Sequence, residues 1–250
     1  MSRPTPVLLV GLPRSGTSWV GAVLGAAPTV EYLREPITQE WLVRGGTTPM
    51  VDPHQDNAYE ELSVATLSDG ATARLIKEVN PYLVPFCVEN GLAEVLLLHR
   101  HPCAVALSYF ERGWTNLDLQ RRFGVAESGD YWFDHGSYQA LHLNSAVRTA
   151  AASPHAQVIS YESLTADPVA AFSHLAAQLG IDWGPVSFAH LESTLTDESR
   201  SDPYALTRDA AAATRRWQDK LTPSQQSAVV SGYAAHADPT APTPPETLPR

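Results

Sequence analysis

The segment 11–18 reads GLPRSGTS and lies between an apolar run and a helix-like pattern. Such a loop is typical of phosphate binding, because backbone N–H groups and the N-terminus of the following helix surround the anion. Nucleotide triphosphatases use the form G-x-x-x-x-G-K-[ST], but here Thr17 stands at the lysine position and the cation is Arg14, inside the loop. The sequence therefore predicts a nucleotide whose transferred group is not a magnesium-bound γ-phosphate.

A second candidate anion site follows the apolar run 95–99. Arg100 ends this run, Pro102 occupies a plausible first helical position, and Ser108 lies two turns into the predicted helix. The planar, permanently charged guanidinium of Arg100 suits a phosphate, and the Ser108 hydroxyl can donate to the same group.

Short apolar or β-branched runs alternate with helix-like patterns along the chain. This alternation predicts a three-layer α/β fold of the P-loop type, a mostly parallel sheet with helices on both faces. The predicted strands are 7–10, 30–33, 74–76, 95–99 and 158–161. Asp167 and Thr222 are expected to cap helices that begin at Pro168 and Pro223, and Gln225 completes a capping box with Thr222.

The composition predicts a single globular domain over residues 1–237. The chain has 250 residues, 44% of them hydrophobic and 18% charged, which suffices for a full core. A formal charge of −10 argues against a general nucleic-acid or anionic-membrane surface, so any anion site must be local. The apolar stretch 7–12 is too short for a membrane span, and Cys87 and Cys103 indicate neither a disulfide framework nor a zinc site. We expect a cytoplasmic protein with reduced, buried thiols and no nucleic-acid partner.

Two segments do not fit the repeating framework, residues 37–70 and the aromatic-rich residues 111–138. In open α/β sheets, excursions beyond the carboxyl ends of strands commonly hold a second substrate, although irregularly spaced aromatic side chains also pack lids. We therefore interpret both as acceptor-side insertions. The segment 238–250 is rich in proline and poor in apolar residues, which predicts a disordered tail.

Four segments together resemble the sulfotransferases that use 3′-phosphoadenosine-5′-phosphosulfate (PAPS), in their P-loop-type, bacterial-like form. Residues 13–19 (PRSGTSW) are similar to the family's 5′-phosphosulfate loop, and residues 98–109 (LHRHPCAVALSY) to its strand-to-helix 3′-phosphate element. The stretch 158–180, which begins VISYESL, is similar to its Y-E-D-L…P…L-G stretch. Residues 215–221 resemble its C-terminal cofactor-closing segment, although the glycine-rich form of that segment is absent.

This resemblance implies a role for each motif residue. The 5′-phosphosulfate would be held by Pro13, Arg14, Ser15, Gly16, Thr17 and Ser18. Arg100 and Ser108 would hold the 3′-phosphate and so distinguish a 3′-phosphorylated adenosine from ATP. Tyr161 would lie near the adenine, and Arg215 and Arg216 would reach the 3′-phosphate from the C-terminal segment. The transfer requires no metal.

The implied reaction is in-line attack of an acceptor oxygen or nitrogen on sulfur, which needs a base for the acceptor's proton. We favour Glu35, just past the second predicted strand, where Pro36 should keep its backbone extended. His54 and His99 are rival bases, since many cytosolic sulfotransferases use a histidine. Lys77, which ends the third predicted strand, resembles a lysine that several sulfotransferases place near the sulfonate.

Several questions stay open at this level. Glu78 is either the pairing partner of Lys77 or a second proton acceptor. The acceptor is expected to be a hydroxyl or an amine of a small molecule or glycoconjugate, and the sequence does not indicate the oligomeric state. The alternatives are a P-loop kinase or nucleotide hydrolase, and a non-catalytic nucleotide-binding member of the family. A kinase would need a lysine at position 17 and a magnesium-holding aspartate at a strand end, where this chain carries Arg100.

Overall fold

The computed structural model describes residues 6–68, 74–196 and 210–241. Its centre is a five-stranded sheet with the order β2-β3-β1-β4-β5, in which every neighbouring pair is parallel. The strands are β1 (Val7–Val10), β2 (Glu31–Arg34), β3 (Arg74–Glu78), β4 (Glu94–His99) and β5 (Ala156–Ser160). The predicted α/β fold is confirmed, and each predicted strand lies within two residues of an observed one.

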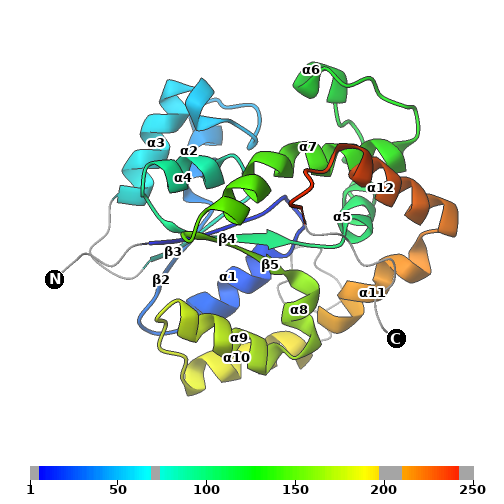
Figure 1. Cartoon of the computed structure of the whole chain (residues 1–250). Helices are drawn as coiled ribbons and strands as arrows, with labels where there is room; N and C mark the ends of the chain where they lie inside the picture. The colour runs from blue at the N-terminus through cyan, green and yellow to red at the C-terminus, as the bar shows by residue number, and fades with distance from the viewer. Residues whose placement is uncertain (1–5, 69–73, 197–209, 242–250) are drawn as a thin grey trace.

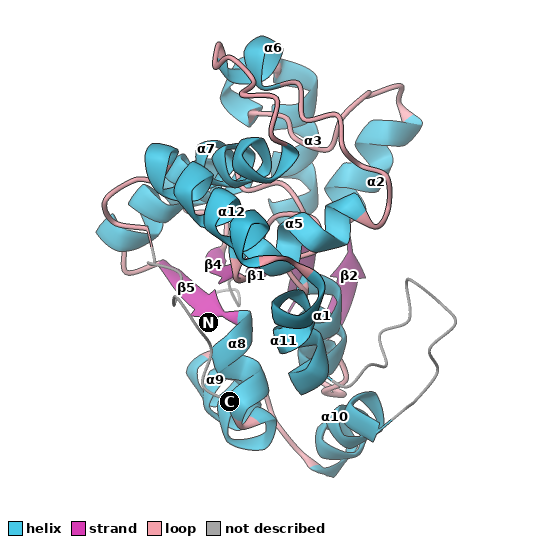
Figure 2. Cartoon of the chain, turned by 90° about the vertical axis from the view of Figure 1, so that its right-hand side faces the viewer, coloured by secondary structure: helices cyan, strands magenta, loops and turns pink. Residues whose placement is uncertain are grey.

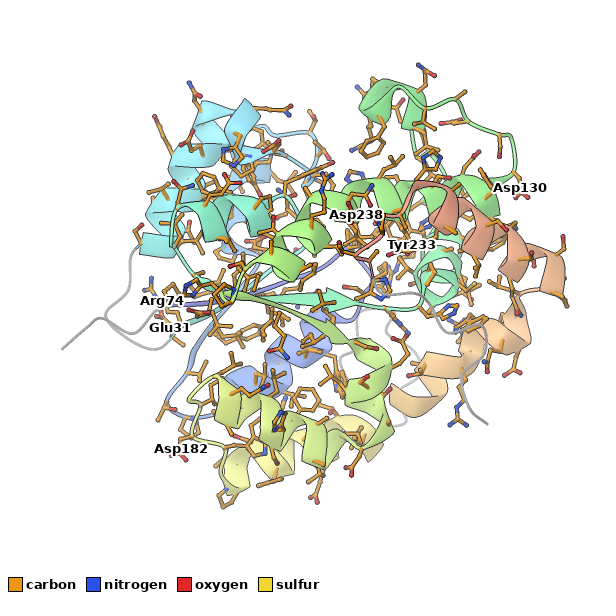
Figure 3. All side chains as sticks on the ribbon, in the orientation of Figure 1. Glu31, Arg74, Asp130, Asp182, Tyr233 and Asp238 are labelled. Carbon is orange, nitrogen blue, oxygen red and sulfur yellow. The ribbon has the colours of Figure 1, made fainter. Side chains whose placement is uncertain are left out.

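The central strands are apolar because both faces of the sheet are covered by helices. Along β1, Leu8 and Val10 face one hydrophobic cluster, whereas Val7 and Leu9 face the other. At the edge, β2 and β3 are joined by an ion pair between Arg74 and Glu31, 2.5 Å apart (Figure 3). The sheet is therefore the middle layer of three.

The first helical layer lies on the lower face of the sheet in Figure 1. It consists of α1 (Thr17–Gly25), α8 (Tyr161–Ala166), α9 (Pro168–Gln178) and α10 (Pro185–Thr196). Trp19 of α1 is central here, because its ring packs against Tyr161 and Phe172 and its Nε1 donates to Thr194 Oγ1 at 3.0 Å.

The opposite layer contains α3 (Asn57–Ser68), α4 (Leu83–Glu89), α7 (Tyr131–Ala152) and α12 (Pro223–His236) (Figures 1 and 2). Helices α7 and α12 pack backbone to backbone through Gly136 and Gly232. A Cβ atom on Gly136 would collide with the carbonyl oxygen of Val229, and one on Gly232 with that of Phe133. Only glycine allows this close a crossing.

The remaining helices lie around the carboxyl ends of the strands. They are α2 (Pro36–Val43), η1 (Pro53–Gln55), α5 (Pro102–Phe110), α6 (Leu119–Phe123) and α11 (Ala210–Lys220). Of the two sequence insertions, 37–70 forms most of α2 with η1 and α3, and 111–138 forms α6 and the first turns of α7. These insertions thus bring helices, not only loops, to the side of the sheet where an α/β fold binds its ligands.

The predicted helix starts are confirmed. Asp167 accepts from Ala170 N at 3.1 Å, and Thr222 and Gln225 form the reciprocal capping box of α12. Pro102 is the first residue of α5, which His101 caps through its side chain. Both cysteines are buried free thiols.

The start of the predicted disordered tail is ordered. Asp238 lies beside α7 (Figure 3), where its backbone N–H donates to Asn144 Oδ1 at 2.8 Å. The same asparagine donates to the carbonyl oxygen of His236 at 2.8 Å. Polar contacts to α7 therefore hold residues 238–241 despite their low apolar content, and residues 242–250 lie outside the described part. In the described ranges, no helix is long and apolar enough to span a bilayer.

Candidate active site

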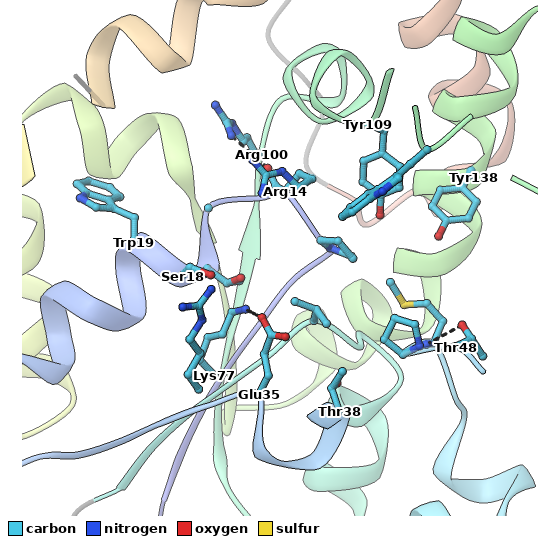
Figure 4. Close-up of a pocket in the computed structure, with 18 of the residues that line it drawn as sticks. Arg14, Ser18, Trp19, Glu35, Thr38, Thr48, Lys77, Arg100, Tyr109 and Tyr138 are labelled. Carbon is cyan, nitrogen blue, oxygen red and sulfur yellow. Dashed lines mark hydrogen bonds and ion pairs between the residues drawn. The ribbon is translucent and has the colours of Figure 1, made fainter. Parts of the chain in front are cut away.

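A cavity of about 560 Å³ opens at the carboxyl ends of the strands. Its walls come from the loop after β1, the ends of β2 and β3, the start of α8, and both insertions (Figure 4). The sheet thus brings together residues that are more than 140 positions apart in the chain, as parallel strands do at their carboxyl edge.

The loop after β1 has the geometry of an anion cradle. Gly16 adopts a φ of 102°, and a Cβ atom there would lie 2.5 Å from the ring of Tyr161, so only glycine fits. Gly16 is the N-cap of α1 and supplies no side-chain hydrogen bond to the first turn of the helix. The first amides of α1 are therefore not satisfied by a capping side chain, which leaves them for an anion. The buried Ser15 hydroxyl also has no hydrogen-bond partner in the described residues.

Arg14 and the two residues predicted for a second phosphate lie together. Arg14 Nε donates to Ser108 Oγ at 2.9 Å. Arg100 Nη1 donates to the Arg14 carbonyl oxygen at 3.1 Å, and the two arginines lie next to each other in Figure 4. Arg100 Nη2 donates to the Ala213 carbonyl oxygen at 2.9 Å, and its guanidinium lies 4.4 Å from the centre of the Tyr161 ring. Arg100 Nε is buried without a hydrogen-bond acceptor among the described residues. Two guanidinium groups therefore converge on one end of the cavity, and the Ser108 hydroxyl holds one of them.

Glu35 and Lys77 form an ion pair on the cavity wall, through Glu35 Oε1 and Lys77 Nζ (Figure 4). The lysine side chain is 1% exposed and the glutamate side chain 24%. Burial lowers the pKa of Lys77, and the charge of Glu35 opposes that shift. Both side chains thus line the cavity, and the carboxylate is the more exposed of the two.

The predicted extended backbone at Glu35 is wrong, because this residue adopts φ 54° and ψ 41°, the left-handed helical region. The following proline disfavours the right-handed helical region, and the elements on either side of Glu35 fix its left-handed conformation. Glu35 N donates to the Lys77 carbonyl oxygen at 2.6 Å, which keeps the residue in the sheet, and α2 begins at once with Pro36. A non-glycine residue held in this region at a cavity is a strained feature that surrounding contacts must maintain.

Glu78 supplies such a contact. Its carboxylate accepts from Ile37 N at 2.8 Å, Thr38 N at 3.3 Å and Thr38 Oγ1 at 2.6 Å, and so caps α2 from inside the protein. Burial raises the pKa of Glu78 to about 7. The partner of Lys77 is therefore Glu35, whereas Glu78 is fully buried against α2.

Several predicted site residues do not reach the cavity. His54 lies at Glu89, with Nε2 to Oε2 3.3 Å, and packs on the Phe86 ring. His99 is buried with its Nε2 3.2 Å from the Tyr233 hydroxyl, and burial lowers its pKa to about 4.

The C-terminal arginines also lie elsewhere. Arg216 donates twice to the carboxylate of Glu111, at 2.7 and 2.5 Å, because both exposed side chains meet where α11 passes the end of α5. Arg215 is exposed and does not line the cavity. The contact that α11 makes with the site is instead the Ala213 carbonyl oxygen, which sequence reasoning missed because a backbone group leaves no signal in residue type.

Both insertions contribute residues to the opposite end of the cavity. From residues 37–70 come Thr38, Leu42, Thr48, Pro49 and Met50, and from residues 111–138 come Trp114, Asn116, Leu117, Arg122 and Tyr138. Tyr109, next to Ser108 on α5, joins this wall and packs edge-on against Trp114. Sequence reasoning did not single out Tyr109, Arg34 or Arg122; the neighbouring motif residues Ser108 and Glu35 were the available signals for the first two.

In the ranges 6–68, 74–196 and 210–241, no cluster of three or more His, Cys, Asp or Glu side chains could hold a metal ion. A parallel sheet, a phosphate-type loop after its first strand and convergent arginines define the class: a P-loop-type α/β protein built to hold a nucleotide anion. Within that class the chain belongs to the sulfotransferase family, because the family model of the sulfotransferase domain matches residues 4–235.

Solved structures agree on the fold. The sulfotransferase domain of the Synechococcus PCC 7002 olefin synthase superposes with a TM-score of 0.60 at 14% identity, covering 94% of this chain and 95% of that chain. The sulfotransferase domain from the curacin biosynthetic pathway gives a TM-score of 0.56 at 15% identity, covering 93% and 99%. Mouse sulfotransferase SULT7A1, complexed with PAP, gives 0.54 at 17% identity, covering 94% and 85%. A sequence search of curated proteins finds no match.

Proposed function

We propose that this protein is a PAPS-dependent sulfotransferase that sulfonates a hydroxyl or amine of a small-molecule or glycoconjugate acceptor. The observation that carries the proposal is the convergence of Arg14, Arg100 and Ser108 on a phosphate-type loop that has Thr17 in place of the nucleotidase lysine. Membership of the sulfotransferase family supports it. So does the presence of PAP in the structures of mouse SULT7A1 and retinol dehydratase, which share the fold.

The residues present fit such a nucleotide. The uncapped first turn of α1 and the partnerless Ser15 hydroxyl suit the 5′-phosphosulfate. The buried, unpaired Arg100 Nε suits the 3′-phosphate, because a buried donor without an acceptor costs on the order of 1–3 kcal/mol and a phosphate oxygen would remove that cost. We assign the adenine contact to Tyr161, and its position against Gly16 and under Arg100, next to both phosphate sites, supports this assignment.

When bound, PAPS supplies a sulfonate on an activated phosphosulfate linkage. In the transfer, a bond forms between the acceptor oxygen and sulfur, and the bond between sulfur and the 5′-phosphate oxygen breaks. Glu35 takes the acceptor's proton, since it is the carboxylate that faces the cavity in the described residues. Lys77 orients that carboxylate through the ion pair. Arg14 and the loop amides stabilise the charge on the sulfonate and the leaving phosphate.

The experiment that tests this proposal is calorimetric binding of 3′-phosphoadenosine-5′-phosphate and of ADP, each with and without magnesium. We expect tight, magnesium-independent binding of the first and a collapse of affinity when the 3′-phosphate is absent. Preference for ADP with magnesium would contradict the proposal and favour a kinase. Binding without sulfonate transfer to any of a broad acceptor panel would indicate a non-catalytic member.

A further inference from the structure

The charges on the cavity wall do not balance. Five cationic side chains and, in the described part of the chain, one carboxylate line it. Three of the cations have contacts that fit the proposed chemistry: Arg14 and Arg100 at the nucleotide end, and Lys77 beside Glu35. The other two are Arg34 and Arg122.

Neither Arg34 nor Arg122 uses its guanidinium in a hydrogen bond or ion pair with the described residues, and both side chains are exposed. Arg34 directly precedes Glu35 at the end of β2, so it belongs to the reacting centre. Arg122 is on α6, in the second insertion, and its charge acts on Tyr138, Tyr82 and His142. Tyr138 lies across the cavity from Trp19, on the side of Thr48 (Figure 4). The charge of Arg122 is thus at the acceptor end, away from the nucleotide residues.

The cavity wall that the two insertions supply is mostly apolar, with Thr38, Thr48 and Asn116 as its uncharged polar side chains. It contains Trp114 and Leu117 from the second insertion, Met50 from the first, and the Tyr138 ring, whose centre is 6.1 Å from that of Tyr109 on α5. Such a surface suits an aromatic or aliphatic body, and a few polar groups then fix its orientation.

We propose that the acceptor carries a carboxylate, which Arg122 binds, on an apolar body whose hydroxyl reaches Glu35. This inference rests on the proposed function and names its substrate class. A guanidinium matches a carboxylate as a two-donor fork, and an overall charge of −10 makes a local cation necessary to hold an anionic acceptor.

The neighbouring Arg121 provides the matched control. It belongs to the same helix but is 79% exposed, pairs with Asp118 and does not line the cavity. Loss of Arg121 and loss of Arg122 change the net charge equally, so a difference between the two variants reports the cavity position and not the overall field.

The test is calorimetric binding of 3-(4-hydroxyphenyl)propionate, of its amide and of the corresponding phosphonate, with and without 3′-phosphoadenosine-5′-phosphate present. We expect the acid to bind about tenfold or more tightly than the amide. Arg122→Ala should abolish this preference and Arg121→Ala should keep it. Equal affinity for acid and amide, failure of both to bind at millimolar concentration, or an unchanged preference in Arg122→Ala would overturn the inference. So would Arg122-dependent binding of the phosphonate alone.

Nucleotide affinity separates this inference from the proposed function. If 3′-phosphoadenosine-5′-phosphate binds without magnesium but acid and amide bind alike, only the acceptor inference fails. If the nucleotide does not bind, the proposed function fails, and the acid and amide titrations without nucleotide still decide whether Arg122 selects a carboxylate. A loss of nucleotide affinity of more than about twofold in Arg122→Ala would place Arg122 in the nucleotide site instead.

Discussion

The two ends of the cavity are built in different ways. At the nucleotide end, the polar side chains contact one another and the backbone: Arg14 donates to Ser108, and Arg100 donates to the carbonyl oxygens of residues 14 and 213. At the other end, aromatic and aliphatic side chains dominate, and the guanidinium of Arg122 makes no hydrogen bond or ion pair within the described residues. The first end is preorganised by its own hydrogen bonds, whereas the second depends on packing.

This difference explains where each end can change. A site held by mutual hydrogen bonds loses several contacts when one member is replaced, because the remaining buried donors are left unsatisfied. A site formed by packing against helices α6 and α7 can exchange side chains one at a time. Under the proposed function, the nucleotide end would therefore define the class of reaction, and the acceptor end would define the substrate.

The largest effect is expected at the boundary between the two ends, where Glu35 stands. Glu35→Gln should lower kcat by about 10²- to 10⁴-fold, the usual contribution of a general base, because the amide cannot take the acceptor's proton. Calorimetry should find the affinity for 3′-phosphoadenosine-5′-phosphate nearly unchanged, since the loop and Arg100 are intact. The measurement is steady-state sulfonate transfer from PAPS.

The control for this variant is His54→Ala. His54 lies at Glu89 and not in the cavity, so turnover should be unaffected. Full activity in Glu35→Gln together with a large loss in His54→Ala would move the base to the histidine and remove Glu35 from the boundary.

The next effect tests the preorganised end. Arg100→Ala and Arg14→Ala should each weaken nucleotide binding about ten- to hundredfold, because a charge-assisted phosphate contact is worth roughly 1.5–3 kcal/mol. Acceptor binding, measured separately, should change less. Affinity within twofold of the parent in both variants would contradict the assignment of this end to the nucleotide.

A smaller effect concerns Glu78, the buried carboxylate that caps α2 next to Glu35. The pKa of Glu78 is raised from 4.5 to about 7 in the folded protein. Its contribution to stability is therefore complete below about pH 4.5 and is lost as the pH rises through 7. Glu78→Gln keeps an acceptor for Ile37 N but has no such titration, so the parent should lose on the order of 2 kcal/mol relative to the variant between pH 5 and 8. Urea unfolding of both proteins at several pH values measures this difference. The same dependence of the free energy of unfolding on pH in parent and variant would contradict the prediction.

The smallest effect is expected at Arg216, which lies outside the nucleotide end. Arg216 pairs with Glu111 on the surface, and exposed ion pairs contribute little. Arg216→Ala should change nucleotide affinity by less than about twofold. A tenfold loss would show that Arg216 leaves Glu111 to bind the nucleotide, and would extend the preorganised end to α11.

Much of the framework was predictable from local patterns. The strands follow from apolar runs, and the helix starts follow from Asp167, Thr222 and the adjacent prolines, because these signals act within a few residues. The loop after β1 was predictable for the same reason, since its glycine, arginine and hydroxyl residues are consecutive. That Arg14, Ser108 and Arg100 lie together also followed, once parallel strands were expected to end at one edge.

The rest depends on contacts between distant segments. The left-handed conformation of Glu35 requires the Lys77 carbonyl oxygen and the Glu78 cap on α2, and neither is visible in the Arg-Glu-Pro sequence. Arg122 differs from Arg121 only in the direction it takes from a short helix, which no spacing rule specifies. The ion pair of Arg216 was not predictable either, because its partner, Glu111, is 105 residues away in the chain.

The glycine crossing of α7 and α12 sets how this protein can diversify. Because the backbones of residues 136 and 232 each touch the other helix, neither position can accept a side chain without separating the pair. Tyr138 lies half a turn beyond Gly136, so this part of the wall at the acceptor end belongs to a helix, α7, that the crossing holds in a fixed position. Paralogues that use a different acceptor should therefore vary in residues 111–123, which precede α7 in the chain. They should retain glycine at positions 136 and 232.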